Sequence, residues 1–130
     1  MNRDEIREKT MQMLFQMDVN DDFDYNNLVP IEEDRKAINK DQAIATLEAI
    51  KDHIVEIDDT ISKNLEKWSI DRIAKTDLAI LRNSVAEILY RDDIPNKVSV
   101  NEAVELAKKY GDEKSYAFVN SILSKIISSL

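Results

Sequence analysis

The sequence contains no cysteine, a single glycine and only two prolines in its 130 residues. The missing cysteine excludes a disulfide framework and a thiolate metal site. The shortage of glycine and proline argues against β-hairpins and sandwiches, whose turns require residues with positive φ. It also excludes the usual glycine-rich loops that hold phosphate groups. Long apolar runs are absent too, so we expect no membrane span, no signal peptide and a cytoplasmic location.

Ile, Leu, Ala, Lys and Glu are abundant instead, and this composition predicts an all-α fold. A chain of 130 residues can bury one core, and no linker or repeat divides it, so we expect a single domain over residues 1–130. The net charge of −8 argues against a non-specific nucleic-acid binder, because phosphate attraction needs a positive field. A local basic patch, or a partner that supplies positive charge, is compatible with it.

Groups able to perform catalysis are scarce. His53 is the one histidine, and its helical register with Ile50, Ile54 and Ile57 is typical of a half-buried structural or surface histidine. The carboxylates form no E-x-x-H pair, no H-E-x-x-H motif and no EF-hand loop, so no metal site is indicated. We therefore expect no catalytic residue, no metal and no cofactor, and we expect that the protein is not an enzyme.

Apolar residues at helical spacing predict a first helix over residues 3–17, with Asn2 available as its cap. We expect its buried face to consist of Ile6, Thr10, Met13, Leu14 and Met17. Residues 19–40 are acidic and weakly periodic, which predicts a loop with a short helical start after Pro30.

The middle of the chain has a longer helical pattern. Residues 41–66 continue it beyond the usual length of a globular helix, so we expect two helices joined by a kink or turn near residues 53–56. A short helical turn over residues 70–74 follows. Thr76 is then expected to cap the next helix and to place Asp77 in its first turn, where a carboxylate favours the positive end of the helix dipole.

The last third of the chain predicts a helical hairpin. Ser99 and Glu102 have the spacing of a capping box, and Gly111 stands where a helix end favours a left-handed residue. Ser115 is expected to cap the final helix, whose apolar stripe is Phe118, Val119, Ile122, Leu123 and Ile126. Together these patterns predict a compact bundle of six to seven helices.

Two groups of side chains are candidates for a binding surface. Phe118 either packs in the core or forms an aromatic ledge that stacks a base, beside Lys114 and the free N–H groups of residues 114–117, which can hold a phosphate. Asn120 either reads a base edge or ties two helices together. In the first helix, Arg3, Arg7 and Lys9 form either a solvated face or a weak RNA-contacting arm.

Four short motifs follow one another along the chain. They are Thr10-Met-Gln-Met-Leu-Phe15, Asp77-Leu-Ala-Ile-Leu-Arg82 with Glu87, Val100-Asn-Glu-Ala-Val-Glu-Leu-Ala107, and Phe118-Val-Asn120. Each one alone is weakly specific, but four colinear motifs over nearly the whole chain are strongly specific. In these motifs the sequence resembles the bacterial transcription antitermination factor NusB family.

The resemblance implies an all-helical fold of two small bundles set against each other. It also implies a partner, the ribosomal protein NusE, and a heterodimer that binds the boxA element of nascent RNA within an antitermination complex on RNA polymerase. The RNA-contacting residues expected by position are Arg3, Arg7, Lys9, Lys114, Ser115, Phe118 and Asn120, of which Phe118 stacks a base. Phe15 and Asp77 match positions that face NusE.

Two features depart from the family pattern. Acidic Asp4 and Glu5 separate the arginines that often stand consecutively in the family, and Ser121 occupies the glycine position of its F-V-N-G motif. Two other functions stay open as hypotheses. One is an accessory domain of an rRNA cytosine methyltransferase, and the other is a helical protein-interaction module without an RNA role. A monomer and a homodimer are equally compatible with the sequence.

Overall fold

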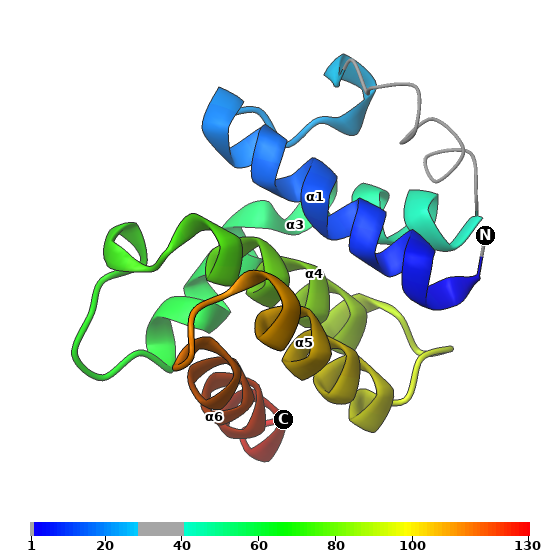
Figure 1. Ribbon diagram of the computed structural model, residues 1–130. Helices are drawn as coiled ribbons and strands as arrows, with labels where there is room; N and C mark the ends of the chain where they lie inside the picture. The colour runs from blue at the N-terminus through cyan, green and yellow to red at the C-terminus, as the bar shows by residue number, and fades with distance from the viewer. Residues whose placement is uncertain (1, 29–40) are drawn as a thin grey trace.

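The computed structural model describes residues 2–28 and 41–130, and these residues form helices connected by turns and loops (Figure 1). The elements are α1 (Arg3–Asn20), η1 (Tyr25–Asn27), α3 (Asp41–Lys63), η2 (Ile70–Arg72), α4 (Lys75–Tyr90), α5 (Asn96–Tyr110) and α6 (Ser115–Ser128), where η marks a 3-10 helix. The predicted all-α class is confirmed. The expected six to seven helices become five α-helices and two 3-10 turns in the described ranges, because the pattern over residues 41–66 forms one kinked element.

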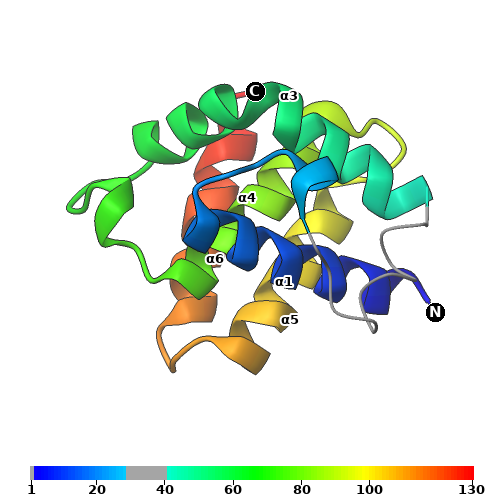
Figure 2. The same cartoon turned by 90° about the horizontal axis from the view of Figure 1, so that it is seen from above.

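Helix α4 lies at the centre of the molecule and packs against α1, α3, α5 and α6 (Figures 1 and 2). Every residue from Asp77 to Ile88 in this helix is buried. Helices α1 and α3 lie on one side of α4, and the antiparallel pair α5 and α6 lies on the other. The two small bundles implied by the resemblance are therefore present, and α4 belongs to both.

The first helix forms as the sequence predicts. The Asn2 side chain accepts a hydrogen bond from the Glu5 backbone N–H at 2.9 Å, which satisfies one of the free donors at the helix start. All five residues of the expected apolar face are buried: Ile6, Thr10, Met13, Leu14 and Met17. The helix runs one turn further than predicted and ends at Asp21, whose backbone is left-handed with φ of 52°. The helical start predicted after Pro30 lies outside the described residues.

The kink predicted near residues 53–56 is present in α3. His53 has non-helical φ and ψ of −132° and 23°, so the helix changes direction at this residue. The half-buried imidazole stacks on Tyr90 of α4, with ring centroids 4.1 Å apart and planes 9° from parallel. This contact supports the structural interpretation of His53, since stacked rings at this distance bury apolar area and fix the bend.

Three predicted helix caps are wrong. Helix α4 begins at Lys75 rather than after Thr76, and helix α5 begins at Asn96, directly after Pro95, so Ser99 lies inside it. The Ser99 hydroxyl is buried and donates to a Glu87 carboxylate oxygen at 2.8 Å instead of capping a helix. Ser115 is already inside α6, and its hydroxyl accepts from the Asp112 backbone N–H at 3.0 Å. In each case the helix begins earlier than local capping rules predict, by between one residue and about one helical turn.

The prediction of a left-handed Gly111 is also wrong, because this residue is extended, with φ of −89° and ψ of −174°. Any residue adopts such angles, so the need for glycine is steric. A Cβ atom at Gly111 would lie 2.3 Å from both Cβ and Oγ of Ser115 and 2.8 Å from the carbonyl oxygen of Ala107. The glycine is therefore required by the close approach of the start of α6 to the end of α5.

Replacing this glycine tests which of the two explanations holds. We expect Gly111→Ala to reduce the free energy of unfolding by about 1–3 kcal/mol, because the tight packing must be pushed apart. Gly111→Asn should be at least as damaging, whereas a left-handed site would tolerate asparagine well. Urea unfolding followed by circular dichroism measures both variants. A mild effect of asparagine combined with a large effect of alanine would contradict the steric explanation.

Candidate functional site

The predicted arginine arm of α1 divides into one buried and one exposed residue. Arg7 is only 4% exposed, and its guanidinium donates two hydrogen bonds to the equally buried Glu87 of α4, at 2.8 and 3.2 Å. Glu87 also accepts the hydrogen bond from Ser99, so the three side chains connect α1, α4 and α5. The expectation that Arg7 presents its charge to solvent is corrected by this geometry, since its donors are committed inside the protein.

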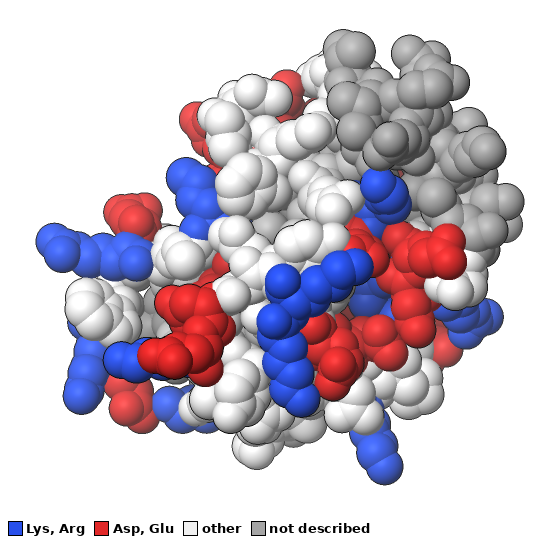
Figure 3. Space-filling model, viewed as in Figure 1, with Lys and Arg blue, Asp and Glu red and all other residues white. Residues whose placement is uncertain are grey.

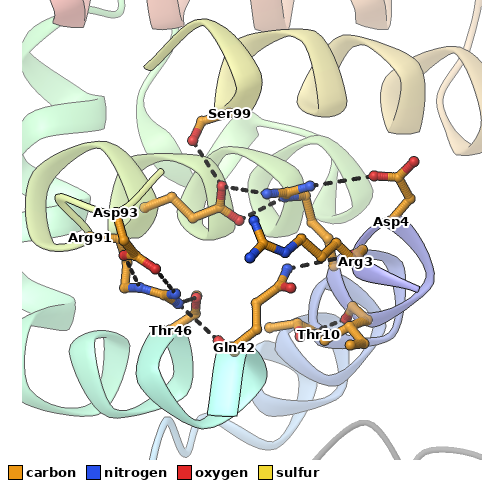
Figure 4. A network of polar contacts seen from close by, with 11 residues as sticks. Arg3, Asp4, Thr10, Gln42, Thr46, Arg91, Asp93 and Ser99 are labelled. Carbon is orange, nitrogen blue, oxygen red and sulfur yellow. Dashed lines mark hydrogen bonds and ion pairs between the residues drawn. The ribbon is translucent and has the colours of Figure 1, made fainter. Parts of the chain in front are cut away.

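Arg3 keeps an exposed side chain beside a pocket of about 550 Å³ between the start of α1, the start of α3 and the α4–α5 connection (Figure 4). Arg91 contributes a second guanidinium to this wall, but its donors bind Asp93 at 2.8 and 3.0 Å, the Gln42 carbonyl at 2.9 Å and the Thr46 hydroxyl at 3.0 Å. Of the pocket's three arginines, Arg3 alone is exposed to solvent.

Carboxylates surround this end of the molecule. Figure 3 shows acidic side chains crowded on the face that carries α1 and α5, and Asp4 and Glu5 of α1 and Glu105 of α5 are exposed. Burial and the neighbouring Asp4 carboxylate raise the pKa of Glu102 above its ordinary value, as expected where like charges gather. Lys9, the third residue of the predicted arm, is half-buried. An RNA phosphate that approached Arg3 would therefore meet repulsion from nearby carboxylates.

The candidate residues of α6 lie on different sides of that helix. Lys114 is exposed at the start of α6, whereas Ser115 is 3% exposed, so its hydroxyl faces the protein interior and an RNA contact by Ser115 stays a prediction. Phe118 is half-buried and packs against the core, which agrees with its interpretation as a core residue, and base stacking by its exposed part stays a prediction. Its outer edge lines a groove of about 170 Å³ with Trp68 and Lys125.

Asn120 does not share that groove. Two residues along a helix correspond to a rotation of about 200°, so Phe118 and Asn120 face nearly opposite directions. Asn120 is exposed and lines a separate groove between α5 and α6, of about 650 Å³, whose charged residues are Glu102, Glu105 and Lys108. The candidate residues of α6 therefore do not form one continuous surface.

The predicted partner residue Phe15 lies at the edge of an apolar groove. This groove has a volume of about 450 Å³ and is lined by Phe15, Gln16, Val19, Asn20, Asn27 and Leu28. Val19 is 61% exposed and Phe15 is 36% exposed, one turn apart on α1. The same turn of α1 reaches the start of α4 through Asp18, whose carboxylate lies 3.2 Å from the Lys75 ammonium. Exposed apolar groups of this kind mark contact surfaces.

Asp77, the second predicted partner residue, is 8% exposed, and its Oδ1 atom has no hydrogen-bond partner. Burial raises the pKa of this carboxyl above its ordinary value, a hydrogen bond to Ser115 lowers it in part, and the nearby Asp112 carboxylate raises it again. A group whose pKa is raised by folding contributes stability below its unfolded pKa and loses that contribution as the pH rises through its folded pKa. Ionised Asp77 therefore destabilises the fold at neutral pH.

From this sign we expect Asp77→Asn to raise the free energy of unfolding at pH 7 by about 1 kcal/mol. The gain should shrink as the pH falls toward the ordinary carboxyl pKa of about 3.9, where wild-type Asp77 is also neutral. Thermal melts of both proteins between pH 7 and pH 4 measure the difference. A variant less stable than wild type at pH 7 would show that the carboxylate's favourable contacts at the start of α4 outweigh its burial.

Sequence reasoning missed Val19 and Trp68 as surface residues. The available signal for Trp68 is its isolation between charged and polar neighbours in the sequence. Within the described residues no three His, Cys, Asp or Glu side chains are arranged to hold a metal ion. In the same part of the chain, no helix combines the length and apolar character needed to cross a membrane.

The fold and its shallow grooves define an all-helical binding protein, and comparison with known proteins identifies its family. The sequence profile of the NusB family matches residues 4–128. The transcription antitermination protein NusB of Oceanobacillus iheyensis is 46% identical over 130 residues, covering 98% of this chain and 100% of that protein. The chain belongs to the NusB family.

Solved structures agree with this assignment. The structure of T. maritima NusB superposes with a TM-score of 0.84 at 37% identity, covering 98% of this chain and 92% of that one. A structure of antitermination factors NusB and NusE in complex with dsRNA matches with a TM-score of 0.79 at 30% identity, covering 98% of this chain and 97% of that one. The resemblance stated from the sequence motifs is therefore confirmed.

Proposed function

We propose that this protein is a transcription antitermination factor that binds boxA RNA together with the ribosomal protein NusE. In this proposal it acts in the cytoplasm as a non-enzymatic adaptor and carries the RNA into the antitermination complex on RNA polymerase. The observation that carries the proposal is the similarity of this chain to a chain in the structure of NusB and NusE in complex with dsRNA. The match covers 97% of that chain. The antitermination names of the relatives support the same function.

The charge distribution explains why a partner is needed. The protein carries a net charge of −8, and the exposed cation of the α1 arm, Arg3, lies among Asp4, Glu5 and other carboxylates. Attraction between such a surface and RNA phosphates is weak on its own. A basic partner bound beside it reverses the local field, so the composite surface binds RNA that the isolated chain binds poorly.

The groove at Phe15 and Val19 is the surface that we assign to NusE. The exposed apolar side chains at its edge provide apolar surface that a partner can bury. Asp77 belongs to the first turn of α4. Asp77 itself is 8% exposed and its unpaired Oδ1 atom is buried, so the exposed apolar side chains, rather than this carboxylate, supply the contact that we propose. A role of Asp77 toward NusE stays a prediction.

A gel shift with boxA RNA, with and without NusE, tests the proposal. We expect weak binding by the chain alone and at least roughly tenfold tighter binding when NusE is present. Arg3→Glu should weaken binding by the complex, while Lys97→Glu, the same charge change at another exposed site, should have little effect. An RNA affinity that NusE leaves unchanged would rule out the adaptor mechanism. Arg7→Glu is unsuitable for this test because it would bury two carboxylates together.

The partner groove makes its own prediction. We expect Val19→Asp to weaken NusE binding by roughly tenfold or more, because the complex would have to bury an unpaired charge. Its thermal stability should stay close to wild type, since Val19 is 61% exposed. Val55→Asp is the matched control, because Val55 is 67% exposed on α3 and lies outside the groove. Calorimetric titration with NusE measures the affinities, and equal effects of the two variants would place NusE elsewhere.

A further inference from the structure

Trp68 is the one tryptophan of the chain, and it is 58% exposed in the connection between α3 and α4. Both sides of this connection are fixed. Leu65 precedes the tryptophan, Ile70 and Ile73 follow it, and all three pack against the core. A fixed backbone with a large aromatic side chain held in solvent has an apolar surface that nothing in the described chain covers.

The tryptophan lines the same groove as Phe118 of α6. The groove is formed by Leu65, Glu66, Lys67, Trp68, Phe118, Ser121, Ile122 and Lys125. An ion pair of 2.8 Å between Lys125 and Glu66 joins α6 to the connection and keeps the two walls together. Two aromatic rings from distant parts of the sequence thus border one narrow recess.

The surroundings of this recess are basic, unlike most of the surface. From residue 63 to residue 75 four exposed cations, Lys63, Lys67, Arg72 and Lys75, stand against two exposed carboxylates, Glu66 and Asp71, in a chain of net charge −8. Figure 3 shows lysine and arginine side chains projecting at the left edge, with acidic side chains between them, where Figure 1 places the α3–α4 connection. The groove at Asn120, by contrast, combines Tyr116 with two glutamates and one lysine.

We propose that Trp68 is a second stacking residue for an unpaired base of an RNA strand, in the same groove as Phe118, whose stacking role the family resemblance already implies, with Lys67 and Lys125 beside the strand's phosphates. The inference rests on the proposed RNA-binding function and extends it to a segment outside α1 and α6. Aromatic faces with nearby cations are the usual combination for single-stranded nucleic acid, because every base has a face to stack. The site selects unpaired RNA, since bases in a duplex are already stacked on one another.

The occupant is RNA rather than a protein surface because of the charge. An apolar recess that received a protein segment would need no cationic rim, and the groove at Phe15 and Val19, whose described lining residues include no charged side chain, suits a protein partner better. The half-buried Phe118 supplies a fixed wall, and the exposed Trp68 supplies a face that a base can cover. The position of Ser121 in the same groove places a hydroxyl within the recess, where it can donate to a base or phosphate.

The single tryptophan allows a direct test in the complex with NusE. Intrinsic fluorescence is titrated with single-stranded boxA RNA, and the signal of the Trp68→Phe complex is subtracted as the blank. Stacking should quench the Trp68 emission, with a midpoint at the RNA concentration that gives half-maximal gel shift. RNA annealed to its complement should leave the emission unchanged, and an equal response to the duplex would overturn the stacking site.

Matched variants complete the test. Trp68→Ala should weaken RNA binding roughly tenfold, and Trp68→Phe should retain most of the affinity because it keeps an aromatic face. Tyr116→Ala is the control, since Tyr116 is 45% exposed on α6 and lines the acidic groove instead. Circular dichroism melts confirm that each variant is folded.

The outcomes separate this inference from the proposed function. If Trp68→Ala binds RNA normally and RNA leaves the emission of the wild-type complex unchanged, the stacking site alone is overturned. Quenching by NusE without RNA, with no further change when RNA is added, identifies a protein contact and also overturns it. If the wild-type complex with NusE binds no RNA at all, both the stacking site and the proposed function fail.

Discussion

Glu87→Gln is expected to reduce the free energy of unfolding by about 3 kcal/mol or more. The reason is the position of its partner: the Arg7 guanidinium is 4% exposed, and both of its short hydrogen bonds end on Glu87. Among the described residues Asp4 also lies near it, 3.8 Å away, but is 70% exposed, and Glu102 is close enough to interact with the guanidinium. Removing the negative charge would leave a cation inside the protein with little compensation. Urea unfolding monitored by circular dichroism measures the loss.

A series of variants separates the charge from the shape of this cluster. Ser99→Ala removes a single hydrogen bond to Glu87 and should cost only about 1 kcal/mol. The double variant Arg7→Met with Glu87→Leu removes both charges and should recover most of the stability lost in Glu87→Gln. A loss below about 1 kcal/mol in Glu87→Gln would mean that water reaches Arg7, and the description of a closed cluster would be wrong.

Local sequence patterns predicted the helices well because the spacing of apolar residues reports directly on which face is buried. They predicted α1 and the kink near His53 from neighbouring residues alone. Helix α4 shows where such patterns fail. Its polar residues Arg82 and Glu87 resemble a solvated face, yet both are buried because their partners come from other helices.

The same limit explains the errors at the candidate site. Arg7 was assigned to the surface because nothing within a few residues of it identifies Glu87, which is 80 positions away, as its partner. Ser99 has the right spacing for a cap, but its hydroxyl binds Glu87 of α4 within the folded protein. Ser115 differs for a local reason, since α6 begins at this residue and its hydroxyl accepts from the Asp112 N–H three residues earlier. The glycine at 111 was recognised as necessary, but the reason is contact with Ser115 rather than backbone angle. Long-range contacts therefore decide which polar residues remain available for binding.

Arg82 links the buried interior to the proposed NusE surface, and its loss should affect both. The guanidinium donates two hydrogen bonds of 2.9 Å to Asp58 of α3, lies 3.3 Å from Asp18 of α1 and stacks 4.7 Å from the centre of the Phe23 ring. Burial alone would lower the pKa of Arg82, but the hydrogen bonds and charges of Asp58 and Asp18 outweigh this effect and raise it. The cation is therefore held firmly in its charged form.

We expect Arg82→Met to destabilise the protein by about 2–4 kcal/mol, because two carboxylates would face each other without their shared cation. The stability of Arg82→Lys should lie between that of Arg82→Met and that of the wild type, since an ammonium cannot reproduce the paired hydrogen bonds to Asp58. Asp18 belongs to the turn of α1 that carries Phe15 and Val19, so NusE affinity should fall together with stability. Hydrogen exchange should become faster at the end of α1 first. Normal NusE affinity in a destabilised Arg82→Met protein would show that the groove keeps its shape without this anchor.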